Sequence, residues 1–181
     1  MAKQARSLRT HELVLDAAAA EFVRHGYPRA NLQHVAARTG LTKGALYAHF
    51  ASKEQLARAL TEHLDQVVDE LLARHKDGNL PAHEQLRALC CALAERVESD
   101  VRFNAALRLV MDEAQSAPEP PRLPADLRAL SAESLADLAV VILVGAYYTA
   151  PDPERRGLAE RVRGLWETVD GAQAVEETGT R

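Results

Sequence analysis

Residues 39–50 read TGLTKGALYAHF, and they combine a few apolar anchors with an otherwise bare helical face. Leu46 and Phe50 are four residues apart, so they share one side of a helix. The other side carries only small residues: Gly44, Ala45 and Ala48. A helix keeps its outer face this small when another structure must come close to it. Two candidates remain open from these residues alone, namely a second helix and a groove of nucleic acid.

The residues on either side of this stretch predict a helix-turn-helix. Asn31 is a good N-cap for a short helix over residues 31–39. Gly40 follows, and glycine readily adopts the positive φ that a tight turn between two helices requires. Thr42 then caps the next helix, which we expect over residues 42–50.

The rest of the chain predicts further helices, because apolar residues recur at helical spacing and no alternating strand pattern occurs. They are expected over residues 8–26, 52–72, 81–97, 101–115, 131–148 and 154–169. Four prolines within residues 116–126 require a loop or extended connector. We therefore predict an all-α protein with an N-terminal three-helix domain (1–53), a helical C-terminal body (54–169) and a flexible tail (170–181).

Charge is distributed unevenly along the chain. Residues 1–53 hold eight Lys/Arg and three Asp/Glu, a net charge of +5, whereas the remaining residues carry −9, and the whole chain carries −4. A basic N-terminal third on an acidic body favours an anionic partner for that third. Nucleic acid is the obvious partner, and a merely solvated charged face is the alternative.

Several other classes of protein do not fit the sequence. Cys90 and Cys91 are adjacent and point to different faces of a helix, so we expect buried thiols and no disulfide. No apolar segment follows the basic residues near the N-terminus, as it would in a secretory signal. The longest apolar run, residues 138–150, is too short for a membrane-spanning helix of about 20 residues. We therefore expect a soluble cytoplasmic protein with no membrane partner.

Catalytic chemistry is not expected from these residues. The seven histidines, at positions 11, 25, 34, 49, 63, 75 and 83, lack the paired spacing of metal ligands. No Ser-His-Asp arrangement and no glycine-rich phosphate loop is evident. The sequence therefore predicts a protein that is not an enzyme, with no cofactor and no metal site.

Residues 8–60 resemble the DNA-binding domain of the tetracycline-repressor (TetR) family. The resemblance lies in a dense set of matching positions: Phe22, Gly26-Tyr27, Val35-Ala36, Gly40-Leu41, Thr42-Lys43-Gly44, Leu46-Tyr47, His49-Phe50 and Lys53-Glu54-Gln55-Leu56. It implies that the helix over residues 42–50 enters the major groove of double-stranded DNA. On this interpretation the bare face of that helix is a recognition face.

The resemblance also implies roles for individual residues. Lys43 lies at the N-terminal end of the recognition helix, and lysine can donate to O6 and N7 of guanine. Tyr47, His49 and Lys53 match positions that commonly contact phosphates, with an ordinary packing or solvated side chain as the alternative for each. The implied DNA-binding residues are Gln33, Thr42, Lys43, Gly44, Ala45, Tyr47, Ala48, His49 and Lys53.

TetR-like proteins usually carry a helical body that binds a small ligand and dimerises through its last two long helices. The resemblance therefore implies a homodimer, with Leu138, Ile142, Leu158, Val162, Leu165 and Trp166 in its interface. Two helices of the body have inward apolar faces with no obvious inward charge, which suits a small lipophilic effector. The expected effector-binding residues are Leu86, Leu89, Cys90, Leu93, Phe103, Leu107 and Met111.

The segment GALYAHFASKEQLA, residues 44–57, is also similar to the γ-butyrolactone receptor group of actinobacteria. Those receptors are usually longer between the equivalents of positions 116 and 135 and carry a pocket-lining tryptophan there. This chain has a proline connector instead, and its only tryptophan, Trp166, lies in the last helix. Two readings thus stay open: a repressor that a small effector releases from its operator, and a dimeric DNA-binding regulator whose pocket has closed.

Overall fold

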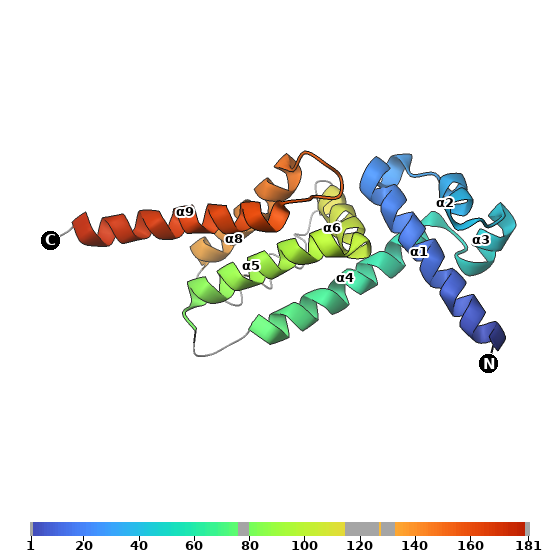
Figure 1. Ribbon diagram of the computed structural model, residues 1–181, viewed down its shortest axis with the longest axis horizontal. Helices are drawn as coiled ribbons and strands as arrows, with labels where there is room; N and C mark the ends of the chain where they lie inside the picture. The colour runs from blue at the N-terminus through green and yellow to red at the C-terminus, as the bar shows by residue number, and fades with distance from the viewer. Residues whose placement is uncertain (1, 76–79, 115–126, 128–132, 180–181) are drawn as a thin grey trace. The chain divides into compact units, whose positions relative to one another are not determined.

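The computed structural model describes residues 2–75, 80–114, 127 and 133–179, and every element in these ranges is a helix (Figure 1). The all-α prediction is therefore confirmed. In chain order the helices are α1 (Ala2–Arg29), α2 (Leu32–Thr39), α3 (Lys43–His49), α4 (Lys53–His75), α5 (Ala82–Ser99), α6 (Val101–Ala114), α8 (Glu133–Thr149) and α9 (Leu158–Gly179). The predicted proline connector lies outside the described residues.

The helices form two compact units, each with its own packing. The first unit comprises Met1–Val67 and Asp100–Glu119, and so contains α1, α2, α3, most of α4, and α6. The second comprises Val68–Ser99 and Pro120–Arg181, with the end of α4, α5, α8 and α9. The predicted domain boundaries after residues 53 and 169 remain predictions.

Capping side chains begin the helices where the sequence indicates. Asn31 accepts a hydrogen bond from the Gln33 amide at 2.9 Å, and thereby caps α2. Ser52 accepts from the Gln55 amide at 3.3 Å at the start of α4. At Gly26 the φ of +71° interrupts the helical geometry of α1, which confirms the predicted break after the first long helix.

In the first unit, α6 packs against α1 through two arginines of α6. Arg102 donates to Asp16 and Glu12 at 2.6 Å each. Arg108 donates to the Val23 carbonyl at 2.5 Å, close to the point where α1 is interrupted. It therefore satisfies a carbonyl that the interrupted helix leaves without its usual partner.

Replacing Arg102 by alanine should lower the free energy of unfolding by about 1 to 3 kcal/mol, because two neighbouring carboxylates would lose their shared cation. Urea unfolding followed by circular dichroism measures this change. Arg74→Ala is the matched control, since Arg74 pairs with Glu70 in an exposed i,i+4 bridge and should cost at most about 0.5 kcal/mol. If both variants lose the same free energy of unfolding, the ion pairs of Arg102 do not stabilise the packing of α6 against α1.

Asp100 caps the first turn of α6. Its Oδ1 accepts from the amides of Arg102 and Phe103 at 2.9 and 3.1 Å, and its Oδ2 lies 2.8 Å from Nε2 of His63 on α4. Burial opposes ionisation of this carboxyl, but the hydrogen bonds from His63 and the two amides outweigh burial and lower the pKa of Asp100 below its usual 3.8. The ionised carboxylate therefore stabilises the folded chain.

A carboxyl whose pKa is lower in the folded chain than in the unfolded chain stabilises the fold at pH values above its unfolded pKa. This stability is lost as the pH falls through the folded pKa. The free energy of unfolding of the wild type should therefore fall more steeply below about pH 4 than that of Asp100→Asn, which has no carboxylate to protonate. Urea unfolding at about pH 6 and again below pH 4 compares the two proteins. Parallel pH profiles would show that Asp100 contributes no such stability.

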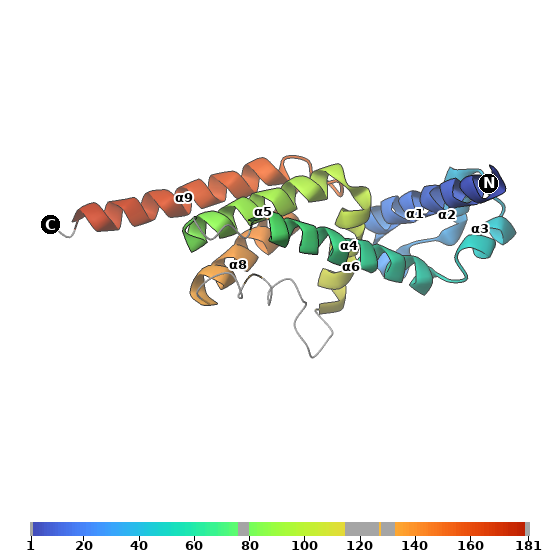
Figure 2. The ribbon, with the colours of Figure 1, turned by 90° about the horizontal axis from the view of Figure 1, so that it is seen from below.

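In the second unit, α9 runs beside α5 (Figures 1 and 2). Arg87 on α5 pairs with Asp170 on α9 at 2.7 Å. The Glu98 carboxylate, at the end of α5, accepts from the Ala159 amide at 2.8 Å in the first turn of α9, where a negative charge is favourable. The helix continues to Gly179, beyond the end predicted at residue 169, because Ala, Gln and Glu in this segment are good helix formers.

None of the described helices is long and apolar enough to cross a membrane.

Candidate nucleic-acid interface

Helices α2 and α3 form the predicted helix-turn-helix. Gly40 has a φ of +67°, and its amide donates to the carbonyls of Ala36 and Ala37, so the turn closes the end of α2. Thr42 caps α3 by accepting a hydrogen bond from the Ala45 amide at 3.2 Å. Leu46 is fully buried beneath α3, so the opposite side of this short helix faces outward.

The outward side of α3 is open. A Cβ added at Gly44 would meet no atom within 4 Å, so no described part of the chain covers this position. The six exposed residues of the predicted DNA-binding set are Gln33, Thr42, Lys43, Gly44, Tyr47 and Ala48, and the three half-buried ones are Ala45, His49 and Lys53. The bare face therefore does not serve packing within the described chain. It remains accessible to a partner.

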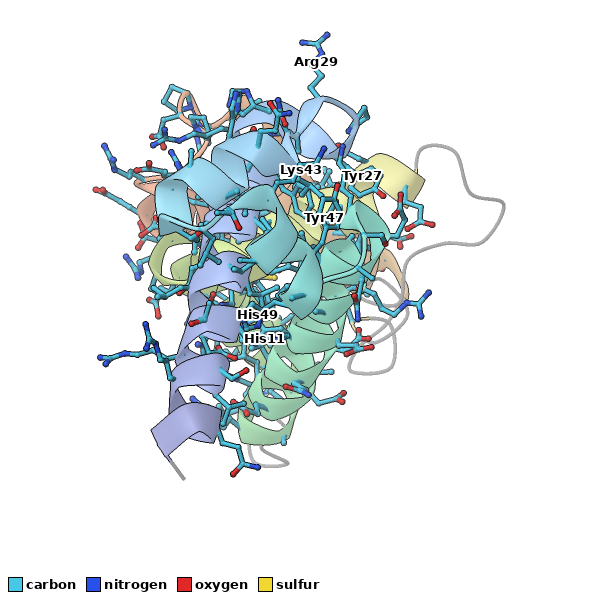
Figure 3. All side chains as sticks on the ribbon, turned by 90° about the vertical axis from the view of Figure 1, so that its right-hand side faces the viewer. His11, Tyr27, Arg29, Lys43, Tyr47 and His49 are labelled. Atoms are coloured by element: carbon cyan, nitrogen blue, oxygen red, sulfur yellow. The ribbon has the colours of Figure 1, made fainter. Side chains whose placement is uncertain are left out.

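Lys43 stands at the first position of α3 and is exposed. Its Nζ lies 5.9 Å from the ring centroid of Tyr47, one turn further along the helix. Both residues are labelled in Figure 3, which views the first unit end-on. The pair places one cation and one hydroxyl on the open side of the helix.

Lys53, at the start of α4, is positioned by contacts with the end of α1. Its Nζ donates to the Pro28 carbonyl at 3.3 Å and lies 4.7 Å from the ring centroid of Tyr27. The Tyr27 hydroxyl in turn donates to Glu54 at 3.0 Å. Burial and this hydrogen bond raise the pKa of Tyr27, so the hydroxyl remains a donor. Tyr27 thus positions Lys53, a role that was not inferred from the sequence although Tyr27 belongs to the motif.

His49, at the end of α3, contacts α1. Its ring centroid lies 6.3 Å from that of His11, and the His11 ring stacks on Phe50 with centroids 4.2 Å apart. His49 therefore packs against α1 on one side, as expected if it is a packing residue rather than a phosphate ligand. Arg29 was not selected from the sequence; it is exposed and extends away from the end of α1 (Figure 3).

The predicted effector-binding residues fall on two helices of different units. On α5, in the second unit, Leu86, Leu89, Cys90 and Leu93 are buried. Burial raises the pKa of the Cys90 thiol to about 12, so this cysteine behaves as a small apolar side chain. On α6, in the first unit, Phe103 is buried and Leu107 and Met111 are half-buried. Their role in binding an effector remains a prediction.

Among the hollows formed by described residues, one of about 570 Å³ lies in the first unit and one of about 610 Å³ in the second. The first is lined by Tyr27, Pro28, Glu54, Ala57, Arg58, Thr61, Leu109, Asp112 and Glu113. The second is lined by Leu71, Arg74, His75, Ala92, Glu95, Arg96 and Ser99. Neither contains a predicted effector-binding residue. Charged side chains border both, but the exposed lining is mainly apolar in the first hollow and mainly polar in the second.

The predicted interface residues differ in how far they reach the surface. Leu165 on α9 is 42% exposed and Leu138 is half-buried. The four that are buried within the chain are Ile142, Leu158, Val162 and Trp166. All four belong to the core of the second unit, where Ile142 comes from α8 and the other three lie on α9, which packs against α5 and α8.

Three exposed apolar side chains of α8 were not among the predicted interface residues. Val141, Val144 and Tyr148 lie at i, i+3 and i+7, on one side of the helix. Arg161 on α9 donates to the Thr149 carbonyl at the end of α8, and Leu165 follows one turn later on the same side of α9. We refer to Val141, Val144, Tyr148 and Leu165 as the α8/α9 apolar surface.

Comparisons with known proteins agree with this geometry. Residues 14–60 match the family described as bacterial regulatory proteins, tetR family. The A-factor receptor protein of Streptomyces griseus is 46% identical over 69 residues, which cover 38% of this chain and 25% of that protein. The HTH-type transcriptional repressor KstR2 of Mycobacterium tuberculosis is 33% identical over 112 residues, which cover 60% of this chain and 53% of that protein.

A solved structure shares the fold over nearly the whole chain. It is CprB from Streptomyces coelicolor in complex with its biological operator sequence, with a TM-score of 0.67, 24% identity, and coverage of 92% of this chain and 99% of that one. The two curated relatives match over only a quarter and about half of their own lengths. The family model spans the helix-turn-helix described above, and residues 14–60 of this chain therefore form a DNA-binding domain of the tetR family of bacterial regulatory proteins.

Proposed function

We propose that this protein is a homodimeric transcriptional repressor that binds a pseudo-palindromic operator and leaves it when a small lipophilic molecule binds. The open outer face of α3, with Lys43 at its start, carries this proposal. Small residues let the helix backbone approach the edges of the bases, and Lys43 can then donate to a guanine in the major groove. The excess of basic residues in the N-terminal third favours the same partner.

A dimer is expected because one copy of the protein can contact only a few base pairs of the operator. Few side chains of the seven-residue helix α3 can reach base edges, so specific affinity requires two half-sites. The α8/α9 apolar surface leaves four large side chains exposed on the second unit. A two-fold dimer would bury this surface against its own copy.

A small lipophilic effector is supported by the chemistry of α5 and by the relatives. The inward face of α5 is apolar, and the S. griseus relative is named a receptor for A-factor. The second reading, a regulator without an effector, is supported by the close burial of Leu86, Leu89 and Leu93. An effector would have to favour the protein state that fits the operator less well, since only differential affinity shifts the equilibrium.

Selection from genomic DNA tests the proposal. Purified protein should retain a small number of fragments from its own genome, and sequencing should reveal a shared pseudo-palindrome. γ-Butyrolactones of several acyl-chain lengths would then be titrated against the complex, with a neutral sterol fragment as a second lipophilic probe. Release by one class identifies the effector chemistry, whereas retention under all of them favours the effector-free regulator. Retention of random fragments alone would contradict the proposed operator.

Lys43→Ala and Lys53→Ala should weaken operator binding in different ways. Loss of a base contact at Lys43 should cost about 1 to 3 kcal/mol and relax the preference at one base pair. Loss of a phosphate contact at Lys53 should weaken all sequences alike and reduce the salt slope by about one. Titrations of operator and scrambled duplexes at several salt concentrations separate the two effects. Equal losses of sequence preference in both variants would refute the assigned roles.

A further inference from the structure

Three potential metal ligands meet where α1 is interrupted and α2 begins. Glu21 and His25 are four residues apart on α1, and His34 lies in the first turn of α2. The Glu21 carboxylate lies 3.1 Å from Nδ1 of His34 and 3.8 Å from Nε2 of His25. One ligand atom from each residue can be chosen so that all three lie within 4.8 Å of one another.

The carboxylate at the centre of this cluster is held in place by the backbone. The Glu21 side chain is only 3% exposed, and its Oε1 accepts a hydrogen bond from the Asn31 amide at 3.1 Å. Its Oε2 faces His25, so the hydrogen bond to the backbone can persist while the other oxygen binds a cation.

The two histidines leave the cluster open to solvent. His25 is 49% exposed and His34 is 61% exposed, and their ring centroids are 6.4 Å apart in an edge-on arrangement. An ion can therefore reach the cluster without any part of the fold unfolding. One nitrogen of each ring already lies within 4.8 Å of a Glu21 carboxylate oxygen.

We propose that Glu21, His25 and His34 form a Zn²⁺ site that fastens α1 to the first turn of α2. Metal–ligand distances of about 2.0 to 2.2 Å in a tetrahedron place neighbouring ligand atoms about 3.3 to 3.6 Å apart. The separations of 3.1 and 3.8 Å between the Glu21 carboxylate and the two imidazoles are close to this range. Two imidazoles and one carboxylate are ligands that suit Zn²⁺ and its transition-metal neighbours rather than Mg²⁺ or Ca²⁺. Water completes the fourth position.

The position of the cluster gives the ion a structural effect. The segment from the break in α1 at Gly26 to the N-cap Asn31 joins the long part of α1 to α2, and Gly26 gives it a backbone bend of positive φ. An ion bound to both helices closes this short segment and ties α2 to α1. Zn²⁺ therefore stabilises the folded DNA-binding domain by mass action, since the separated ligands of the unfolded chain bind it less well.

Cobalt titration of the full chain, without an affinity tag and stripped of metal by a chelator, tests the site. Co²⁺ should bind one ion per chain with the visible absorption of four-coordinate cobalt, and Zn²⁺ should displace it. His25→Gln and His34→Gln should each weaken binding at least about tenfold. Both positions are exposed, so the variants should melt like the wild type when a chelator is present.

His83→Gln is the matched control, because His83 is an exposed histidine beside a carboxylate in the second unit and should leave the affinity unchanged. Added Zn²⁺ should raise the melting temperature of the wild type and of His83→Gln, and leave that of His25→Gln and His34→Gln unaltered. The proposal is overturned if the wild type binds neither ion at micromolar concentration. It is equally overturned if the His25 and His34 variants bind as tightly as the wild type, which would place the ion elsewhere.

Discussion

Replacing Leu165 by arginine should convert the protein to monomers and weaken operator binding by about 100-fold or more. Leu165 belongs to the α8/α9 apolar surface, and an arginine there would be buried without a partner in the proposed dimer interface. An unpaired buried charge costs about 3 to 5 kcal/mol, and 1.4 kcal/mol corresponds to a factor of ten in affinity. The DNA-binding helices are not altered by this substitution.

Sedimentation equilibrium and operator titration on the same samples measure the two effects. Leu80→Arg is the matched control, because Leu80 is 43% exposed against 42% for Leu165, is in the same unit and lies outside the α8/α9 apolar surface. The control should remain dimeric and bind the operator normally. If Leu165→Arg stays dimeric, or if the wild type is monomeric at micromolar concentration, the protein does not dimerise through the α8/α9 apolar surface.

Replacing Trp166 by alanine should lower the free energy of unfolding by about 3 to 5 kcal/mol, the largest loss of stability expected from any single substitution considered. Trp166 is among the largest buried side chains and is only 1% exposed. Its indole lies against Cys90 on α5, so its removal leaves a cavity between α5 and α9. Urea unfolding followed by near-ultraviolet circular dichroism and by light scattering measures the loss and any aggregation.

Trp166→Phe separates packing from polarity at this position. The buried indole N–H has the Cys90 thiol, a weak acceptor, as its neighbour, so loss of this N–H should cost little in itself. The remaining loss comes from the smaller ring, and we expect about 1 to 2 kcal/mol. A loss below about 1 kcal/mol in Trp166→Ala would mean that the second unit repacks around the site, contrary to the close packing inferred here.

The helix-turn-helix was predictable because its signals are local. Asn31 and Thr42 cap helices, Gly40 supplies the positive φ between them, and a stripe of small residues marks the outer face of α3. Each signal acts within a few residues, so no knowledge of distant contacts is needed. The extent of the first long helix up to Gly26 followed from the same kind of signal.

Contacts between distant residues were not predictable from spacing. Tyr27 holds Lys53 across 26 positions of chain, and His34 reaches Glu21 only because α1 bends at Gly26. A scan for metal-ligand spacing misses this cluster, since His25 and His34 belong to different helices.

The predicted dimer interface shows a second limit of the sequence. Leu158, Val162 and Trp166 share an apolar stripe, and periodicity alone assigns such a stripe to an interface or to a core equally well. In the structure this stripe meets α5 and α8, whereas Leu165 lies outside it and stays exposed. Only the arrangement of three helices distinguishes the inward side of α9 from the outward one.

Footprinting on a selected operator tests the central claim most directly. Hydroxyl-radical cleavage of that fragment, with the stoichiometry measured in parallel, should show two protected half-sites related by pseudo-two-fold symmetry and occupied by at least two chains. Their centres should be separated by about one helical turn of DNA or a multiple of it. In Lys43→Ala the protection should weaken at the same base pair of each half-site. A single protected half-site occupied by one chain, or an unchanged footprint in Lys43→Ala, would contradict operator reading by paired α3 helices.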